Sequence, residues 1–162
     1  MKYLRIDEFD VANGPGVRIV LWLSGCSHKC QGCHNPESWN KDVGLTYTEV
    51  EEKYINNLLD NPYVKGLTLS GGDPLEPWNS DIEKSLRLFK SNHPDKTVWV
   101  YTGYLWEQIK NKEIMKYIDV LVDGPFEIDK RDITLKFRGS SNQRLINVPL
   151  SLAKQEVVLW EE

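Results

Sequence analysis

The chain has 162 residues, of which 40% are hydrophobic and 27% are charged, and its formal net charge is −4. This length and composition are typical of a single globular domain, so we expect residues 1–162 to form one domain around one core. Lys and Arg are not clustered, and no apolar stretch reaches the length of a bilayer span, which argues against nucleic acid and membrane as partners.

The N-terminal part predicts two strands joined by a tight turn. Residues 2–7 alternate weakly and indicate an edge strand, and residues 17–23 (VRIVLWL) indicate a buried strand rich in β-branched and aromatic residues. Asn13-Gly14-Pro15-Gly16 lies between them and is a strong turn signal. Such a Gly-rich loop would also let a ligand or a partner chain approach closely.

All three cysteines of the chain lie in one short segment, residues 24–35, directly after the second predicted strand. Cys26, Cys30 and Cys33 are too few and too closely spaced for a disulfide framework, and no signal peptide is evident, so we expect a reducing, cytoplasmic location. Two metal sites remain. A zinc site would need His28 or His34 as a fourth ligand, whereas a [4Fe–4S] cluster held by three cysteines would leave one iron free to bind a small molecule. The cysteines alone do not distinguish these sites.

The middle of the chain alternates between predicted helices and strands. Thr46 and Glu49 have the spacing of a capping box for a helix over residues 47–60, and Ser80 and Glu83 have the same spacing for a helix that ends near residue 91. The predicted inward-facing residues are Val50, Tyr54, Ile55, Leu58 and Leu59 in the first helix, and Ile82, Leu86 and Phe89 in the second. Further elements are strands over residues 66–70, 97–101 and 119–122 and a helical stretch over residues 106–117. This alternation predicts parallel strands joined by right-handed crossovers.

The C-terminal part is less regular. Residues 138–144 form a polar segment without periodicity, and residues 157–160 indicate a last edge strand. Trp22 and Trp99 fall in predicted strands and are expected in the core, whereas Trp39 and Trp106 are candidates for a partner surface.

Four unusual loops follow the predicted parallel strands: the cysteine loop, Gly71-Gly72-Asp73-Pro74, Thr102-Gly103-Tyr104 and Asp123-Gly124. Because ligands bind at the C-terminal ends of parallel strands, we expect these loops to meet at one rim. The two glycines would let backbone groups approach a ligand, and the carboxylate of Asp73 would add an acceptor for an ammonium group.

The spacing of Cys26, Cys30 and Cys33, followed one strand later by residues 71–74, resembles the radical S-adenosylmethionine enzymes. Within that superfamily, the chain is similar to the family that activates anaerobic ribonucleoside-triphosphate reductase. The remaining matching pieces are Asn13 to Gly16, Ser38-Trp39, Tyr101 to Tyr104, Val122 to Gly124 and Arg138 to Gln143.

The resemblance implies a shortened partial (β/α) barrel of mainly parallel strands. The three cysteines would hold a [4Fe–4S] cluster, whose free iron S-adenosylmethionine would chelate. Gly71, Gly72 and Asp73 would bind the methionine end of this cofactor, and Gly32, Cys33 and His34 would lie beside it. Many members of the superfamily have an aromatic residue where this chain has Gly32, so the contacts to adenine are unassigned.

The implied activity is that of an oxidoreductase. Reductive cleavage of S-adenosylmethionine at the cluster would give a 5′-deoxyadenosyl radical, which would take a hydrogen atom from a glycine of the reductase. The implied partners are the glycyl-radical subunit of the reductase and an electron donor protein such as a flavodoxin. Two alternatives stay open: an activase of another glycyl-radical enzyme, and a zinc-stabilised binding module without catalysis. For Asp123, the sequence leaves open whether it faces the cofactor or caps a turn, and for Arg138, Asn142 and Arg144 whether they do more than order a loop.

Overall fold

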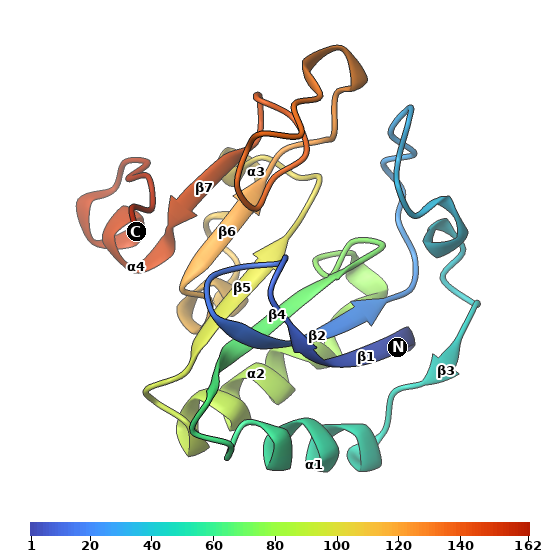
Figure 1. The fold of residues 1–162 in the computed structure, drawn as a ribbon, viewed down its shortest axis with the longest axis vertical. Coiled ribbons are helices and arrows are strands. Elements are labelled where there is room, and N and C mark those ends of the chain that lie inside the picture. Colours follow the sequence, from blue (N-terminus) through green and yellow to red (C-terminus); the bar gives the residue numbers. More distant parts are fainter.

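A computed structural model describes all residues from Met1 to Glu162. Seven strands form one sheet, flanked by four α-helices and four short 3₁₀ helices (Figure 1). The strands are β1 (Lys2–Asp10), β2 (Val17–Leu23), β3 (Leu45–Thr46), β4 (Val64–Gly71), β5 (Thr97–Tyr101), β6 (Val120–Asp123) and β7 (Arg144–Asn147). The α-helices are α1 (Glu49–Leu58), α2 (Asp81–Asn92), α3 (Trp106–Ile109) and α4 (Val148–Lys154), and the 3₁₀ helices are Pro36–Trp39, Pro77–Asn79, Glu113–Tyr117 and Ile128–Lys130.

The strand order is β3-β1-β2-β4-β5-β6-β7. The four central strands β2, β4, β5 and β6 are parallel, and β1, β3 and β7 add antiparallel strands at the two sides. The parallel core of a shortened partial barrel is therefore confirmed. No helix has both the length and the apolar character that crossing a membrane requires.

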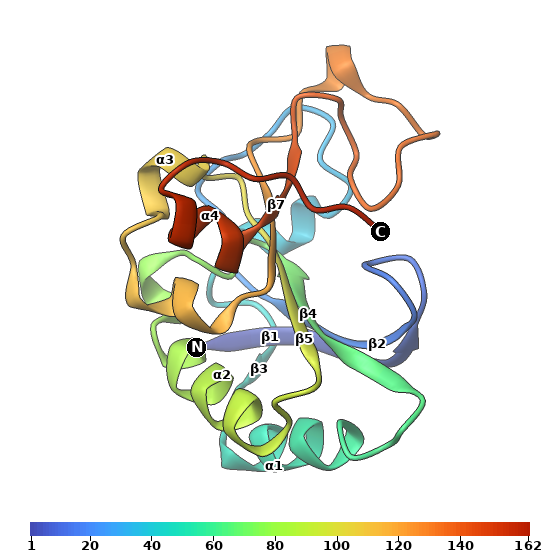
Figure 2. The ribbon, with the colours of Figure 1, turned by 90° about the vertical axis from the view of Figure 1, so that its left-hand side faces the viewer.

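The two faces of the sheet bury different sets of side chains, because successive residues of a strand point to opposite faces. One face packs against the helices and includes Ile19, Leu69 and Val100 of the main core. Figure 2 shows α2, α3 and α4 on this side of the sheet. The other face carries Trp99 with Val120 and Val122, and it is the inner face of the partial barrel.

The charged side chain of Arg18 is fully buried on this inner face. Its guanidinium donates to the Oγ1 atoms of Thr68 and Thr97, both at 2.9 Å, and to the carbonyl oxygens of Leu67, Thr97 and Pro15. Burial lowers the pKa of Arg18 to about 10. Thr68 in turn donates to the carbonyl oxygen of Asn13 at 2.7 Å, so Arg18 anchors the turn that precedes β2.

Both predicted capping boxes are wrong, although both helices exist. The cap of α1 is Thr48, which forms a capping box with Glu51, so the same Thr-x-x-Glu spacing two residues further along is used instead of Thr46 and Glu49. Ser80 makes no capping hydrogen bond because a 3₁₀ helix precedes it and its backbone is already helical.

The buried faces of the two helices were predicted with different success. Ile82, Leu86 and Phe89 of α2 are buried as predicted, and so are Ile55 and Leu59 beside α1. Leu58 is partly buried against the core. Val50 and Tyr54 are exposed instead and line an open groove beside Leu4 and Ile6 of β1 and Leu45 of β3.

The C-terminal third also differs from the prediction. The helical stretch over residues 106–117 is split into α3 and a 3₁₀ helix. The last strand is β7, which starts at Arg144 and pairs antiparallel with β6, while residues 157–160 contribute only an isolated bridge from Leu159 to Ile146.

Candidate functional site

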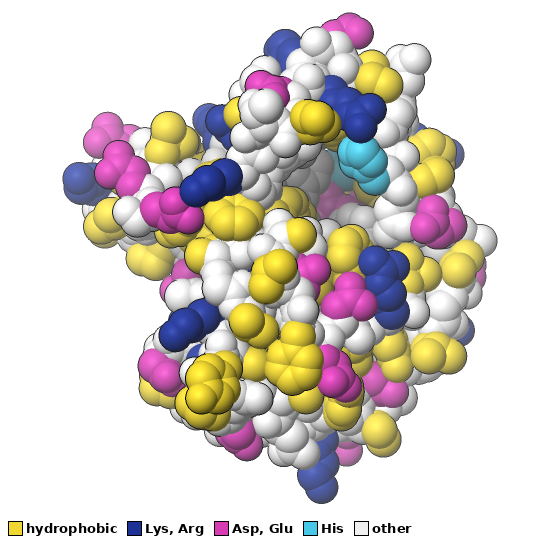
Figure 3. Space-filling model, in the orientation of Figure 1, with side chains coloured by type: hydrophobic (Ala, Val, Ile, Leu, Met, Phe, Trp, Pro, Cys, Tyr) yellow, Lys and Arg dark blue, Asp and Glu magenta, His cyan; other side chains and the backbone are white.

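The four loops predicted to meet at one rim do meet there. They line one cavity of about 290 Å³ at the C-terminal ends of the parallel strands, and the lining includes Cys26, Gly72, Thr102 and Gly124. Figure 3 shows this hollow between the loop of residues 125–143, at the top, and the cysteine loop, with a histidine at its rim. Asn13 of the Gly-rich turn also reaches the cavity.

Cys26, Cys30 and Cys33 are unpaired, partly buried, and all line this cavity. Burial raises the pKa of Cys26 to about 11 and also raises the pKa of Cys30. The backbone N–H of Asn35 points at the Sγ of Cys33 at 3.4 Å, a contact that stabilises negative charge on sulfur. Three thiols that converge on one space, with no partner of their own, fit a cluster held by three ligands.

Backbone hydrogen bonds hold the loop after β4 against the cysteine loop. The N–H of Gly72 donates to the carbonyl oxygen of Leu23, and the N–H of Asp73 donates to that of Gly25, both at 2.8 Å. Gly71 has φ +104°, which favours glycine, and both Gly71 and Gly72 line the cavity. A backbone exposed in this way fits the amino-acid end of a cofactor.

The side chain of Asp73 lies in a different environment from the predicted one, in which its carboxylate faces the ligand. Its side chain is buried and does not line the cavity, because its oxygens accept hydrogen bonds from within the protein. The donors are Leu75 N, Thr102 Oγ1, Gly103 N and His28 Nε2. That Asp73 contacts the cofactor stays a prediction.

The two histidines have different positions. His28 lies between Cys26 and Cys30, and its hydrogen bond to Asp73 raises its pKa. His34 is exposed at the rim of the cavity, with its ring centroid 5.6 Å from that of Phe126. A zinc site that used the Nε2 atom of His28 would have to break the bond to Asp73.

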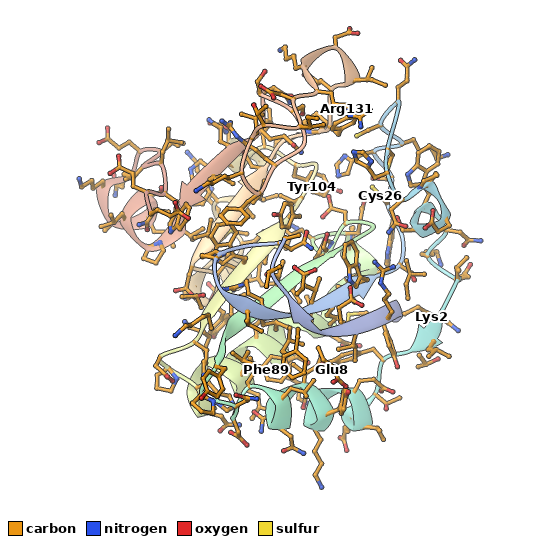
Figure 4. The ribbon with its side chains drawn as sticks, in the orientation of Figure 1. Lys2, Glu8, Cys26, Phe89, Tyr104 and Arg131 are labelled. Atoms are coloured by element: carbon orange, nitrogen blue, oxygen red, sulfur yellow. The ribbon has the colours of Figure 1, made fainter.

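Glu76 is a buried residue of the site that was not predicted from the sequence. One carboxylate oxygen accepts from the backbone N–H and the hydroxyl of Ser27, at 2.8 and 2.6 Å, and the other accepts from the hydroxyl of Tyr104 at 2.9 Å. Burial and this hydrogen bond raise the pKa of Tyr104 to about 12. Figure 4 shows Cys26, which follows β2, and Tyr104, which follows β5, both below Arg131. The sequence did offer a signal for this residue, because Glu76 is a second carboxylate three residues after Asp73.

The conformation of Gly32 explains the missing aromatic residue. Gly32 has φ +77°, and a Cβ there would lie 2.4 Å from the Cδ1 of Ile128. The 125–143 loop therefore occupies the space beside Cys33, and its Phe126 lines the cavity.

Two of the predictions about tryptophan positions are wrong. Trp99 is buried as predicted, but Trp22 lines the cavity and donates to Asp7 at 2.7 Å, so it is not a core residue. Trp106 is buried in the main core and is unavailable as a partner surface. Trp39 is partly buried at the cavity, and its role toward a partner stays a prediction.

Asp123 and the polar segment after it have structural roles. Asp123 is fully buried, accepts from the backbone N–H of Trp106 at 2.8 Å and forms an ion pair with Arg144. Asn142 donates to the carbonyl oxygen of Pro125 at 2.8 Å, and Arg138 donates to that of Gln143. These contacts order the loop that covers the cavity.

The partial barrel, the three-cysteine loop and the glycine loop define a single-cluster iron–sulfur protein of the radical S-adenosylmethionine class. A family described as "4Fe-4S single cluster domain" matches residues 12–146, which contradicts the zinc alternative.

The chain belongs to the family of anaerobic ribonucleoside-triphosphate reductase-activating proteins. It is 44% identical over 146 residues to the family member of Enterobacteria phage T4, with 90% of this chain and 93% of the relative covered. It is 43% identical over 150 residues to that of Pasteurella multocida, covering 88% of this chain and 95% of the relative. The Escherichia coli K12 protein is 41% identical over 148 residues, with coverages of 88% and 96%.

Proposed function

We propose that this chain, as a single domain of residues 1–162, activates anaerobic ribonucleoside-triphosphate reductase by generating a glycyl radical on it. The observation that carries this proposal is the convergence of three unpaired cysteines and an exposed glycine backbone on one cavity, in a member of this family. When bound, the cluster and S-adenosylmethionine supply the electron and the carbon-centred radical that removes a hydrogen atom from the partner's glycine.

Different residues of the chain would bind the cluster and S-adenosylmethionine. Cys26, Cys30 and Cys33 would hold the cluster, and the backbone of Gly71 and Gly72 would hold the methionine end of the cofactor. His34 and Gly32 would lie beside the cofactor, next to Phe126. Because Phe126 is the aromatic residue that replaces the missing one before Cys33 at the cavity wall, we assign the apolar contact with adenine to it.

The proposal also covers the location of the enzyme in the cell and its electron donor. Three free thiols that must bind iron require a reducing compartment, which supports a cytoplasmic location. A cluster at the rim of an open cavity is accessible to an electron donor protein, and a flavodoxin is the donor that we propose.

The proposal is tested by anoxic reconstitution with iron and sulfide. We expect about four irons per chain, formation of 5′-deoxyadenosine when dithionite and S-adenosylmethionine are added, and a glycyl radical signal when the reductase is present. Cys30→Ala should abolish all three, whereas Lys41→Ala, in the exposed stretch that follows the site, should abolish none. A loaded protein that cleaves S-adenosylmethionine but leaves the reductase without a radical would refute the assignment of the partner.

A further inference from the structure

His28 joins the cysteine loop to the loop after β4. It lies between two of the three cysteines, and its Nε2 is 2.6 Å from the Oδ2 of Asp73. Because Asp73 already accepts backbone N–H groups from Leu75 and Gly103, it is the acceptor, and the imidazole donates. The side chains of His28 and Asp73 are 17% and 1% exposed, so little water competes for this bond.

Asp73 extends the link to a third loop. Its oxygens accept from the hydroxyl of Thr102 at 2.9 and 3.0 Å and from the backbone N–H of Gly103 at 2.9 Å. One buried carboxylate thus connects the segments that follow β2, β4 and β5. The side chain of Asp73 does not line the cavity.

The position of the imidazole is also fixed by packing. Its centroid lies 4.6 Å from that of Tyr104, edge to face. On another side it lies against Gly103, where a Cβ would come within 2.5 Å of the His28 Cδ2 atom. The ring can occupy this site only because residue 103 has no side chain.

We infer that His28 is a positioning residue, which aligns the cysteine loop with Gly71 and Gly72 through Asp73 and so sets the affinity for S-adenosylmethionine. This inference rests on the proposed function, in which the iron ligands and the methionine-binding backbone belong to different loops. A cofactor held by both loops binds well only if their separation is fixed. His28, which also lines the cavity, fixes this separation through Asp73.

The experiment compares reconstituted variants by iron content and by the dissociation constant of S-adenosylmethionine, measured from the change in the electron paramagnetic resonance spectrum of the reduced cluster. His28→Leu removes a charge-assisted, buried hydrogen bond and should weaken binding about tenfold while iron is retained. His28→Gln keeps an N–H donor and should stay within about threefold of the wild type. His93→Leu, which removes a buried histidine far from the cavity, should change neither quantity.

A second pair of variants tests the packing. Gly103→Ala should displace the imidazole and weaken cofactor binding about as much as His28→Leu does. His28→Ala creates room for the new methyl group, so adding Gly103→Ala to it should cause no further loss. This non-additivity distinguishes a specific contact from general damage to the loop.

The outcomes separate this inference from the proposed function. A reconstituted wild type that does not bind S-adenosylmethionine would refute the proposed function. A wild type that binds, together with a His28→Leu variant that binds equally well, would overturn only the role of His28. Loss of iron in His28→Gln as complete as in Cys30→Ala would also overturn it, because His28 would then act as a ligand or a folding residue.

Discussion

Gly72 lies directly against Gly25, so close that a Cβ on Gly72 would come within 2.3 Å of the Gly25 carbonyl oxygen. This contact joins the glycine loop to the residue that precedes Cys26. The φ angle of Gly72 is not in the left-handed region, so the constraint on this residue is close approach and not backbone conformation.

Gly72→Ala should therefore push the two loops apart. Overpacking of this kind costs about 1–3 kcal/mol, which corresponds to a loss of affinity for S-adenosylmethionine of about fivefold to 150-fold. The iron content should stay near that of the wild type, because the three sulfurs are on one loop. Isothermal titration under anoxia measures the affinity.

Gly124→Ala is the control. Gly124 also lines the cavity, but an added Cβ would meet no atom closer than the Leu105 Cδ2 at 3.6 Å, so this variant adds a methyl group and backbone strain at φ +94° without overpacking. Equal losses in both variants would show that cavity volume matters and that the contact between Gly72 and Gly25 does not.

The site could be predicted from the sequence where its signal is local. Cys26, Cys30 and Cys33 lie within eight residues, and the glycine loop follows a recognisable strand, so both were placed correctly at the rim. The helices were also found, although their caps were not. Thr46 and Thr48 each have a Glu three residues later, and only the tertiary structure selects Thr48.

Residues whose partners are distant in the sequence were missed. The bond between His28 and Asp73 spans 45 residues, and that between Ser27 and Glu76 spans 49. Trp22 was predicted in the core and Trp106 at a partner surface, and both predictions were wrong. Propensity places tryptophan in strands and at surfaces, but it does not show which face of an element is covered by the rest of the protein. Strand β7 has only four residues, and the polar segment before it conceals its alternation.

Arg18 gives a second prediction, because its buried guanidinium has no carboxylate partner within hydrogen-bonding distance. Arg18→Leu should leave carbonyl oxygens of Leu67, Thr97 and Pro15 without their donors. Each unsatisfied buried group costs about 1–3 kcal/mol, so the free energy of unfolding should fall by about 3 kcal/mol or more. Urea unfolding of the metal-free protein measures it.

Arg87→Leu is the control for this prediction. Arg87 is 64% exposed and lies 3.7 Å from Glu83, so its loss should cost less than about 1 kcal/mol. A smaller loss of stability in Arg18→Leu than in Arg87→Leu would contradict the role of Arg18 as the anchor of the inner face.

Arg144 gives a third prediction, because it binds one buried and one exposed carboxylate. Its Nε is 3.1 Å from the Asp123 Oδ1, and its Nη2 is 3.0 Å from the Glu107 Oε2. Asp123 is the larger cause, and Glu107 the smaller, of the raised pKa of Arg144. Arg144→Met would leave Asp123 buried without its cation and should cost about 2 kcal/mol, less than for a wholly buried pair because Arg144 is about one-third exposed.

Glu107→Gln removes the exposed partner of Arg144 alone and should cost less than about 1 kcal/mol. Asp123→Asn combined with Arg144→Met should recover part of the stability lost in Arg144→Met, because no uncompensated charge remains buried. Thermal unfolding of the wild type and of these three variants measures the differences in stability. The assignment fails if Glu107→Gln is as destabilising as Arg144→Met.

The last prediction concerns removal of the cluster. Residues 27–37 are largely exposed, and none of the three cysteines belongs to the main core. The loop is attached at its two ends by backbone bonds, from Gly25 N to the Ser38 carbonyl oxygen at 2.6 Å and from Cys26 N to that of Trp39 at 3.1 Å. Chelation of the iron should therefore speed hydrogen exchange across residues 26–39 and leave the amides of β4 and β5 protected.

Hydrogen exchange with mass spectrometry, before and after anoxic treatment with a chelator, measures this difference. Cys30→Ala should show the fast exchange without the chelator, because it never assembles the cluster. Since the metal binds the folded loop, its loss should also lower the unfolding temperature of the whole protein by mass action. If β4 and β5 lost their protection together with the loop, the cluster would be needed to fold the sheet itself, and the separation between a metal-dependent loop and a self-sufficient core would be wrong.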